Sequence, residues 1–367
     1  MNTLRIVVKV GTSTLTGGTA ALNRQRMLEL VQQMARLHQQ GHELVLVSSG
    51  AQAAGRERLG FPALERSVSA KQMLCAVGQG RLIQLYSDLF EIFGIVIGQV
   101  LLTRGDLDHR TRYLNARDTL LALIEQRIVP IINENDTTAT DEIRVGDNDN
   151  LSALVANLLE ADLLALLTDQ PGLFTADPRR SADASLIAQV ERVDQDTLAL
   201  AGNSGSGVGT GGMRTKIQAA QLASRSGVTT VIAAGSEPDV LLRLVAGEPL
   251  GTRFAPVISH LEGRKRWLLA EQPRGAVRVD AGAADRLRTG GASLLPVGVT
   301  AVEGEFERGE PLAVRGPDGV TVAHGLTNYN SDDLRRLRGA RSHRIIEILG
   351  YSYGDAVIHR NNLVLLV

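Results

Sequence analysis

The sequence predicts an α/β protein with a mostly parallel sheet sandwiched by helices, followed by a second, smaller β-rich domain. Two observations carry this prediction. Short aliphatic runs alternate with helical patterns up to about residue 250, an order typical of parallel sheets because each strand returns through a helical crossover. The chain also has 367 residues, more than the roughly 250 to 300 at which one hydrophobic core stops growing.

The first domain opens with a β-α-β unit. Residues 4–10 and 43–49 are aliphatic strand patterns, and between them Met27, Leu30 and Met34 recur at helical spacing. The same alternation predicts further elements in the order strand 95–102, helix 114–125, strand 128–133, a helix from residue 150, strand 161–169, helix 216–226 and strand 229–235. Helices should therefore cover both faces of the sheet.

After about residue 250 the helical patterns give way to short strand-like runs. These runs cover residues 276–280, 293–304, 310–316 and 320–325. We therefore expect a main domain over residues 1–258, a linker over 259–274 and a β-rich domain over 275–367.

Composition narrows the class of protein. With 44% hydrophobic and 22% charged residues the chain is globular, and its net charge of -1 is unlike the basic footprint of a dedicated nucleic-acid binder. No apolar run approaches the roughly 18 residues of a membrane span, and Lys9 interrupts the apolar start, so a soluble, cytoplasmic protein is expected. The single cysteine, Cys75, is interpreted as a buried structural thiol.

The predicted strands end in small, hydroxylated or acidic residues: KVGTS, SSGA, NEND and TDQ. Ligands of such sheets bind beyond the carboxyl ends of the strands. Lys9 is one of only four lysines among 39 basic residues, and Gly11 adjoins it, which favours a phosphate-binding turn. The alternative is that Lys9 extends to solvent from an edge strand.

Residues 202–212 contain six glycines and lead into a helix that carries Lys216. Flexible backbone amides, a helix N-terminus and an ammonium group together bind phosphate, although a flexible surface loop would have the same composition. The pattern is neither a Rossmann fingerprint, because no strand precedes it, nor a P-loop.

The segment 133–150 holds six acids and one base, Arg144. This segment does not follow the calcium-loop pattern. Its acidic residues suit recognition of an ammonium group or orientation of a catalytic lysine. The alternative is a solvated acidic loop. Because no covalent nucleophile pattern occurs, cationic loops beside an acidic one favour phosphoryl transfer to a carboxylate, which is already ionised at pH 7 and needs no general base.

Five segments together resemble the signatures of the amino-acid kinase family: KVGTSTLTGG, SSGAQAAGR, NENDTTATDEIRVGDNDNLSA, LLTDQPGLFTADPR and GTGGMRTK. Residues 275 to 367 resemble the PUA module found in many bacterial members. The resemblance implies ATP and Mg²⁺ as cofactors, the side-chain carboxylate of L-glutamate as acceptor at the start of proline biosynthesis, and feedback inhibition by proline at an overlapping site. Homodimers or homotetramers are usual in the family.

The resemblance also assigns residues. Lys9 and Lys216 would contact the transferring phosphoryl group, Asp149 would orient both lysines, and Gly11 and Gly50 would approach the phosphates through backbone amides. Positions expected to hold the amino acid are Ser49, Asn133, Asp136, Asp147 and Asn148. Besides Lys9, the positions that match the nucleotide site are Thr168, Asp169, Thr210, Gly211, Gly212, Met213, Arg214, Thr215 and Lys216. No protein ligand of the metal is identified.

Two alternatives stay open from the sequence. One is another kinase of the same fold that acts on aspartate, acetylglutamate, carbamate or a nucleoside monophosphate. The other is an RNA-binding regulator that acts through the PUA-like domain, because that domain carries a local cluster of arginines: Arg335, Arg336, Arg338, Arg341 and Arg344. The acidic residues of the same domain favour a solvated helix face or an interdomain contact instead.

Overall fold

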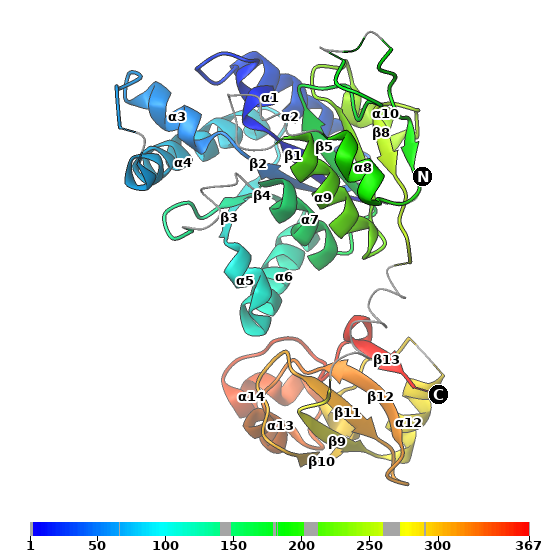
Figure 1. The fold of residues 1–367 in the computed structure, drawn as a ribbon. Helices are drawn as coiled ribbons and strands as arrows, with labels where there is room; N and C mark the ends of the chain where they lie inside the picture. The colour runs from blue at the N-terminus through cyan, green and yellow to red at the C-terminus, as the bar shows by residue number, and fades with distance from the viewer. Residues whose placement is uncertain are drawn as a thin grey trace. The chain divides into compact units, whose positions relative to one another are not determined.

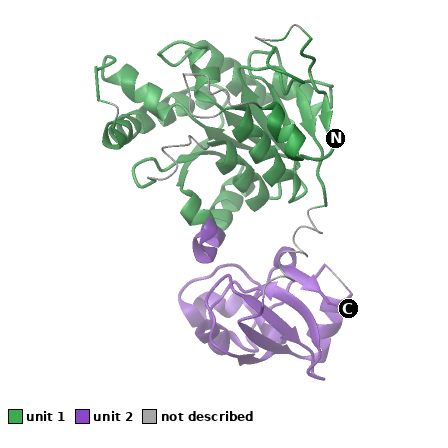
Figure 2. Ribbon diagram, in the orientation of Figure 1, with its two compact units in different colours: residues 1–107, 116–260 green, residues 108–115, 261–367 purple. Residues whose placement is uncertain are grey.

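The computed structural model describes residues 3–65, 67–139, 148–178, 181, 183–201, 212–259, 272–289 and 291–366. The chain divides into two compact units (Figures 1 and 2). Unit 1 comprises residues 1–107 and 116–260, and unit 2 comprises residues 108–115 and 261–367. None of the helices in the described ranges is both long enough and apolar enough to cross a bilayer.

Unit 1 is built on an eight-stranded sheet with the order β3-β4-β2-β1-β5-β7-β8-β6. Its strands are β1 (Arg5–Val10), β2 (Glu43–Ser48), β3 (Ile97–Leu102), β4 (Val129–Glu134), β5 (Leu163–Thr168), β6 (Gln189–Val190), β7 (Thr229–Ala234) and β8 (Thr252–Phe254). Neighbouring strands run parallel except for β7 and β8, which are antiparallel. The predicted α/β class with a mostly parallel sheet is confirmed.

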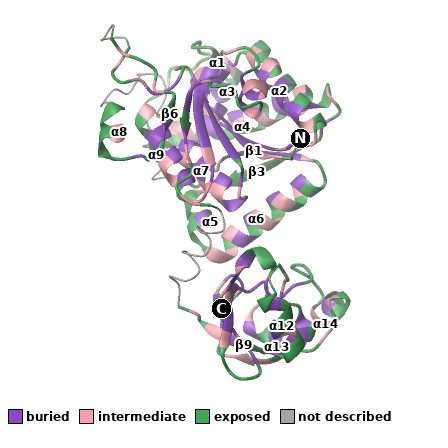
Figure 3. Cartoon of the chain, turned by 90° about the vertical axis from the view of Figure 1, so that its right-hand side faces the viewer, coloured by how far each residue is buried: buried purple, intermediate pink, exposed green. Residues whose placement is uncertain are grey.

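Helices flank this sheet: α1 (Thr12–Thr16), α2 (Arg24–Gln39), α3 (Ala51–Arg58), α4 (Val68–Glu91), α5 (Arg104–Asp108), α6 (Arg110–Glu125), α7 (Asn148–Leu158), α8 (Gln195–Leu200), α9 (Met213–Ser224) and α10 (Val240–Val245). Figure 3 shows the strands buried between helices whose outer faces are exposed. The aliphatic runs form strands because both faces of a covered parallel sheet are apolar. Met27, Leu30 and Met34 face the core from α2, as their spacing predicts.

Helices α3 and α4 approach each other closely through two glycines. A Cβ atom on Gly55 would lie 2.0 Å from the Leu74 carbonyl oxygen, and one on Gly78 would lie 1.8 Å from the Ala51 carbonyl oxygen. No larger residue fits at either position without separating the two backbones. The crossing therefore fixes α3, and with it the turn at Gly50 that begins this helix.

Unit 2 contains a five-stranded sheet with the order β10-β9-β11-β12-β13. The strands are β9 (Gly275–Val279), β10 (Val299–Glu303), β11 (Pro311–Arg315), β12 (Thr321–Leu326) and β13 (Leu363–Leu365), and the helices are α12 (Ala281–Arg288), α13 (Ser331–Leu337) and α14 (Ile345–Leu349). All neighbouring pairs are antiparallel except β9 with β11. The β-rich character that the sequence predicts after residue 275 is confirmed.

Unit 2 has its own core, centred on the fully buried ring of Tyr329. The Tyr329 hydroxyl donates to the Gly354 carbonyl oxygen at 2.6 Å. Arg308, which is also buried, stacks its guanidinium group 3.7 Å from the centre of the Tyr353 ring and hydrogen-bonds the side chain of Asn115. This contact ties residues 108–115 to the rest of unit 2.

Candidate active site

Four neighbouring strands of unit 1 end at the same edge of the sheet, because β4, β2, β1 and β5 are adjacent and parallel. Lys9 lies near the end of β1, paired with Val47 of β2 on one side and Leu166 of β5 on the other. The alternative that Lys9 extends from an edge strand is therefore wrong. Its side chain is held inside the protein, with only 5% of the residue exposed.

Asp149 binds two lysines that are far apart in the sequence. The Lys9 ammonium nitrogen lies 2.6 Å from Asp149 Oδ1, and the Lys216 ammonium nitrogen lies 3.3 Å from Asp149 Oδ2. The Thr215 hydroxyl donates to Asp149 Oδ2 at 2.7 Å. Asp149 is completely buried and Lys216 is 6% exposed, so this cluster lies in a region of weak dielectric screening, where charge interactions are strong.

Burial of the Asp149 carboxyl opposes its ionisation, but the positive charges of Lys9 and Lys216 outweigh that effect. Hydrogen bonds from Lys9 and Thr215 act in the same direction, and the pKa of Asp149 falls to about 2. Asp149 is therefore an anion at pH 7 and accepts hydrogen bonds only. Its role in this geometry is to hold two ammonium groups in fixed positions.

Two helix N-termini bring these groups together. Asp149 is in the first turn of α7 and Thr215 is in the first turn of α9, where backbone N–H groups point outward and favour negative charge. Gly212 caps α9, and its carbonyl oxygen lies 2.8 Å from the Thr215 hydroxyl oxygen, so it shares the single hydroxyl hydrogen with Asp149. The same features that stabilise Asp149 would stabilise a phosphate.

The two glycines expected at the phosphates begin short helices beside the lysines. Gly11 caps α1, and a Cβ atom there would lie 3.5 Å from the Lys9 ammonium nitrogen. Gly50 caps α3 with a φ of 103°, a conformation that glycine adopts without strain. Of the two, Gly11 lies directly beside the Lys9 ammonium group, whereas Gly50 is buried among leucine side chains.

The residues expected to hold the amino acid form a polar group at the ends of β2 and β4. Asn148 donates through Nδ2 to Ser49 Oγ and to Asn133 Oδ1, both at 3.0 Å. Asp136 is half-buried and shares a hydrogen bond with the Cys75 thiol; burial raises the pKa of Asp136, and the bond from Cys75 partly offsets that rise. Asp147 lies outside the described residues.

The residues expected at the nucleotide occupy two places. Thr168 is the last residue of β5, is buried, and donates its hydroxyl hydrogen to Asp169 Oδ1 at 3.0 Å. Gly212 and residues 213–216 form the N-terminal end of α9, where Arg214 is exposed. Thr210 and Gly211, like most of the glycine-rich stretch, fall outside the described part of the chain.

Sequence patterns did not reveal two residues of this site. Gln79 of α4 accepts a hydrogen bond from Asn133 Nδ2 at 2.8 Å, and no local motif marks it. Cys75, read from the sequence as structural only, is buried as expected but also contacts Asp136. Within the described ranges no group of three or more His, Cys, Asp or Glu side chains is arranged to hold a metal ion.

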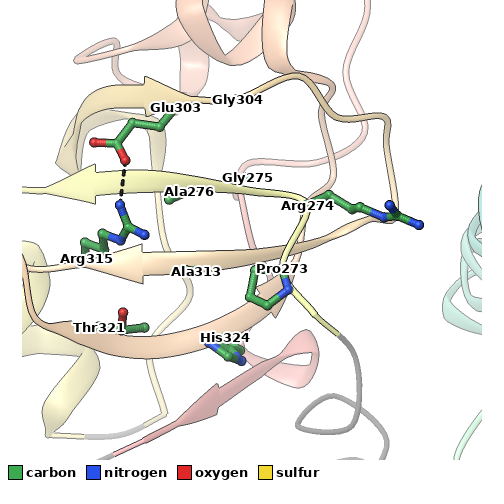
Figure 4. Close-up of a pocket in the computed structure, with 10 residues that line it drawn as sticks. All are labelled: Pro273, Arg274, Gly275, Ala276, Glu303, Gly304, Ala313, Arg315, Thr321 and His324. Atoms are coloured by element: carbon green, nitrogen blue, oxygen red, sulfur yellow. Dashed lines mark hydrogen bonds and ion pairs between the residues drawn. The ribbon is translucent and has the colours of Figure 1, made fainter.

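Unit 2 contains a separate recess of about 470 Å³ beside β9, β11 and β12, shown in Figure 4. Two of its lining side chains pair with each other, because Glu303 accepts from Arg315 at 2.7 Å; Glu303 also accepts at 2.5 Å from Arg278, which lies outside the lining. Two of the five arginines in the cluster of this unit are also paired with acidic side chains. Arg335 pairs with Glu305 and Asp332, and Arg344 pairs with Glu347.

Beside the carboxyl ends of these parallel strands, one buried carboxylate holds two buried lysines, Lys9 from β1 and Lys216 from α9. This arrangement is typical of a phosphoryl-transfer enzyme that works by charge stabilisation. The model of the amino acid kinase family matches residues 4–234, and the PUA domain model matches residues 275–349. The chain belongs to the amino acid kinase family and is a kinase with a C-terminal PUA domain.

Its curated relatives are more specific. Glutamate 5-kinase from Herpetosiphon aurantiacus is 58% identical over 362 residues, which cover 98% of both chains. Glutamate 5-kinase from Cronobacter sakazakii is 55% identical and covers 99% of both chains, and that from Klebsiella pneumoniae is 55% identical over 98% of both. Among solved structures, UMP kinase from Bacillus anthracis matches 69% of this chain and 96% of its own, with 15% identity and a TM-score of 0.48.

Proposed function

We propose that this chain transfers the γ-phosphoryl group of ATP to the side-chain carboxylate of L-glutamate, which yields L-glutamate 5-phosphate in the first step of proline biosynthesis. The observation that carries the proposal is the buried cluster of Lys9, Asp149 and Lys216. The relatives that are 55% to 58% identical over nearly the whole chain, all glutamate 5-kinases, support the choice of acceptor.

The chemistry needs positioning more than it needs proton transfer. A glutamate carboxylate is ionised at neutral pH, so its oxygen can attack phosphorus without a general base. Lys9 and Lys216, held by Asp149, place two positive charges where negative charge develops on the transferring oxygens. Each such donor contributes on the order of 3 kcal/mol in the transition state, and Mg²⁺ carried by the nucleotide neutralises further phosphate charge.

Substrate binding divides between two groups of residues. Ser49, Asn133, Asp136, Asp147 and Asn148 hold L-glutamate, with the carboxylate of Asp136 suited to its ammonium group. Thr168, Asp169 and the segment from Thr210 to Lys216 hold the nucleotide, while the amides at Gly11 and Gly50 approach the phosphates. Proline competes at the glutamate-binding group as a feedback inhibitor.

The chain is organised for this reaction as a catalytic domain over residues 1–258, a linker over 259–274 and a PUA-like domain over 275–367. The protein works in the cytoplasm as a homodimer or homotetramer. Paired charges on unit 2 do not favour the RNA-binding alternative.

The test incubates purified protein with MgATP, hydroxylamine and one amino acid at a time, because hydroxylamine traps acyl phosphates as hydroxamates. We expect hydroxamate with L-glutamate and not with L-aspartate or N-acetyl-L-glutamate. Signal with either of those acids but not with glutamate would assign the chain to another kinase of the same fold. Addition of proline should lower the glutamate signal.

A further inference from the structure

Four polar side chains form a continuous line from α4 to the end of β2. Asn133 Nδ2 donates to Gln79 Oε1 at 2.8 Å. Asn148 Nδ2 donates to Asn133 Oδ1 and also to Ser49 Oγ, both at 3.0 Å. Gln79 therefore connects, through two amides, to residues that the proposed function places at the amino acid.

The direction of every hydrogen bond in this line is set by the backbone. The Glu134 N–H donates to Asn133 Oδ1 at 2.9 Å, and a backbone N–H can only donate, so Asn133 must turn its Nδ2 toward Gln79. The Ser48 carbonyl oxygen can only accept, and Asn148 Nδ2 lies 3.4 Å from it. Asn148 must therefore turn its nitrogen inward along the line.

This orientation leaves one buried acceptor unused. Asn148 Oδ1 is buried and has no hydrogen-bond partner among the described residues. Leaving a buried acceptor unsatisfied is unfavourable unless a ligand supplies a donor. At the other end, Ser49 Oγ already accepts from Asn148, so its own hydrogen can be donated to an anionic group.

We propose that Gln79 is a positioning residue for recognition of the amino-acid substrate. By accepting from Asn133 it keeps the two amides in the orientation that presents Asn148 Oδ1 to an ammonium group and the Ser49 hydroxyl to a carboxylate. This inference rests on the proposed function, because it assigns the acceptor and the donor to the two ends of an α-amino acid. In this proposal Gln79 contacts neither the ammonium group nor the carboxylate of the substrate and acts through Asn133.

Three substitutions at one position separate this role from a general charge effect. Gln79→Glu keeps an acceptor facing Asn133, Gln79→Met removes it at similar size, and Gln79→Lys replaces it with a donor that repels Asn133 Nδ2. If the electrostatic field of the protein alone determined affinity, the anionic substrate would bind more tightly to Gln79→Lys than to Gln79→Glu. The hydrogen-bond line predicts the opposite order.

The measurement is steady-state kinetics with L-glutamate and MgATP varied in turn. We expect the KM for glutamate to stay within about threefold in Gln79→Glu, to rise about tenfold in Gln79→Met and to rise further in Gln79→Lys. The KM for MgATP should change less than about twofold in all three, because Gln79 is connected through Asn133 to the residues proposed to hold glutamate and not to those proposed to hold the nucleotide. Gln84→Met is the matched control, since Gln84 is exposed on the same helix and its side chain donates a hydrogen bond to Asp88.

Melting temperatures of all variants show whether a kinetic change reflects loss of fold. An unchanged glutamate KM in folded Gln79→Met, or a lower KM in Gln79→Lys than in Gln79→Glu, would overturn the inference while the unaltered protein still phosphorylates glutamate. Failure of the unaltered protein to phosphorylate glutamate would instead overturn the proposed function. The two failures are thus distinguishable.

Discussion

Lysine and arginine carry the same charge but differ in size, and the two lysines beside Asp149 are buried. Both ammonium groups reach one carboxylate inside the protein, at 2.6 and 3.3 Å. A planar guanidinium is larger and spreads its charge over three nitrogens. The identity of residues 9 and 216, and not their charge alone, should therefore decide activity.

Lys9→Arg and Lys216→Arg should each reduce kcat at least about a hundredfold, because each displaces a positive charge from the transferring phosphoryl group. Both variants should remain folded, as judged by circular dichroism and melting temperature. Arg243→Lys, the reverse exchange at an exposed ion pair, should leave kcat unchanged. Near-normal turnover in both lysine variants would refute the two-lysine mechanism.

Asp149 should make stability depend on pH in the acid range. Its pKa is about 2 in the folded protein and ordinarily 3.8, so its stabilising effect is complete above about pH 4 and is lost as the pH falls toward 2. Asp149→Asn leaves two buried ammonium groups without their carboxylate and should lower the free energy of unfolding by about 3 kcal/mol at pH 7.

Urea unfolding of both proteins at pH 7, 4 and 2.5 measures this difference. The gap between the unaltered protein and Asp149→Asn should narrow at about pH 2.5, where the carboxyl of the unaltered protein begins to take up its proton. A gap that stays constant or widens in acid would show that Asp149 is not the group responsible.

Helix α4 supports the site through its crossing with α3, whose N-cap residue is Gly50. Gly78→Ala places a methyl group 1.8 Å from the Ala51 carbonyl oxygen, and the two helices must separate. We expect a loss of about 3 kcal/mol in unfolding free energy, measured by urea titration, together with a higher KM for glutamate because Ser49 precedes α3.

Gly80→Ala provides the matched control for that variant. Gly80 is also inside α4, but a Cβ atom there meets nothing within 4 Å. Alanine should stabilise the helix by about 1 kcal/mol at this position. Equal effects of the two substitutions would show that the helix crossing is not tight.

Strands were the most predictable elements, and the first turns of helices the least. The aliphatic run at residues 4–10 forms β1 almost as expected. The helix expected from residue 150 begins at Asn148, because polar residues that resemble a loop in sequence are the ones that favour helix N-termini. Helix α3 was not predicted, since its alanines and glycines show no apolar periodicity.

The pairing of Lys9 with Asp149 follows from sequence only through family resemblance, because the two residues are far apart in the chain and lie on different elements. Physical reasoning could place Lys9 at a strand end and Asp149 in an acidic segment, but it could not give their distance. The contact of Gln79 with Asn133 could not be predicted from the sequence at all. It depends on how α4 lies relative to β4, and no local sequence pattern indicates that arrangement.

Unit 2 should not bind RNA tightly. Its arginines at 335 and 344 are paired with acidic side chains, which offsets part of the positive charge that would displace counterions from a phosphate backbone. We expect dissociation constants weaker than about 10 µM near physiological salt, measured by fluorescence anisotropy with a labelled RNA hairpin and a single strand. Submicromolar binding that weakens steeply with salt would restore the RNA-binding alternative.

β1 is the first strand to be synthesised, yet it lies between β2 and β5 in the sheet. The nascent chain therefore cannot complete the centre of this sheet until β5 has been synthesised. Lys9 leaves the ribosome long before Asp149, and Asp149 before Lys216. The contacts of Asp149 with Lys9 and with Lys216 are thus long-range in sequence, and such a topology is associated with slow folding. Enzymatic turnover would consequently report that synthesis has passed residue 216. It would also report that Lys9 and Lys216, from opposite ends of the kinase sequence, have both come into contact with Asp149.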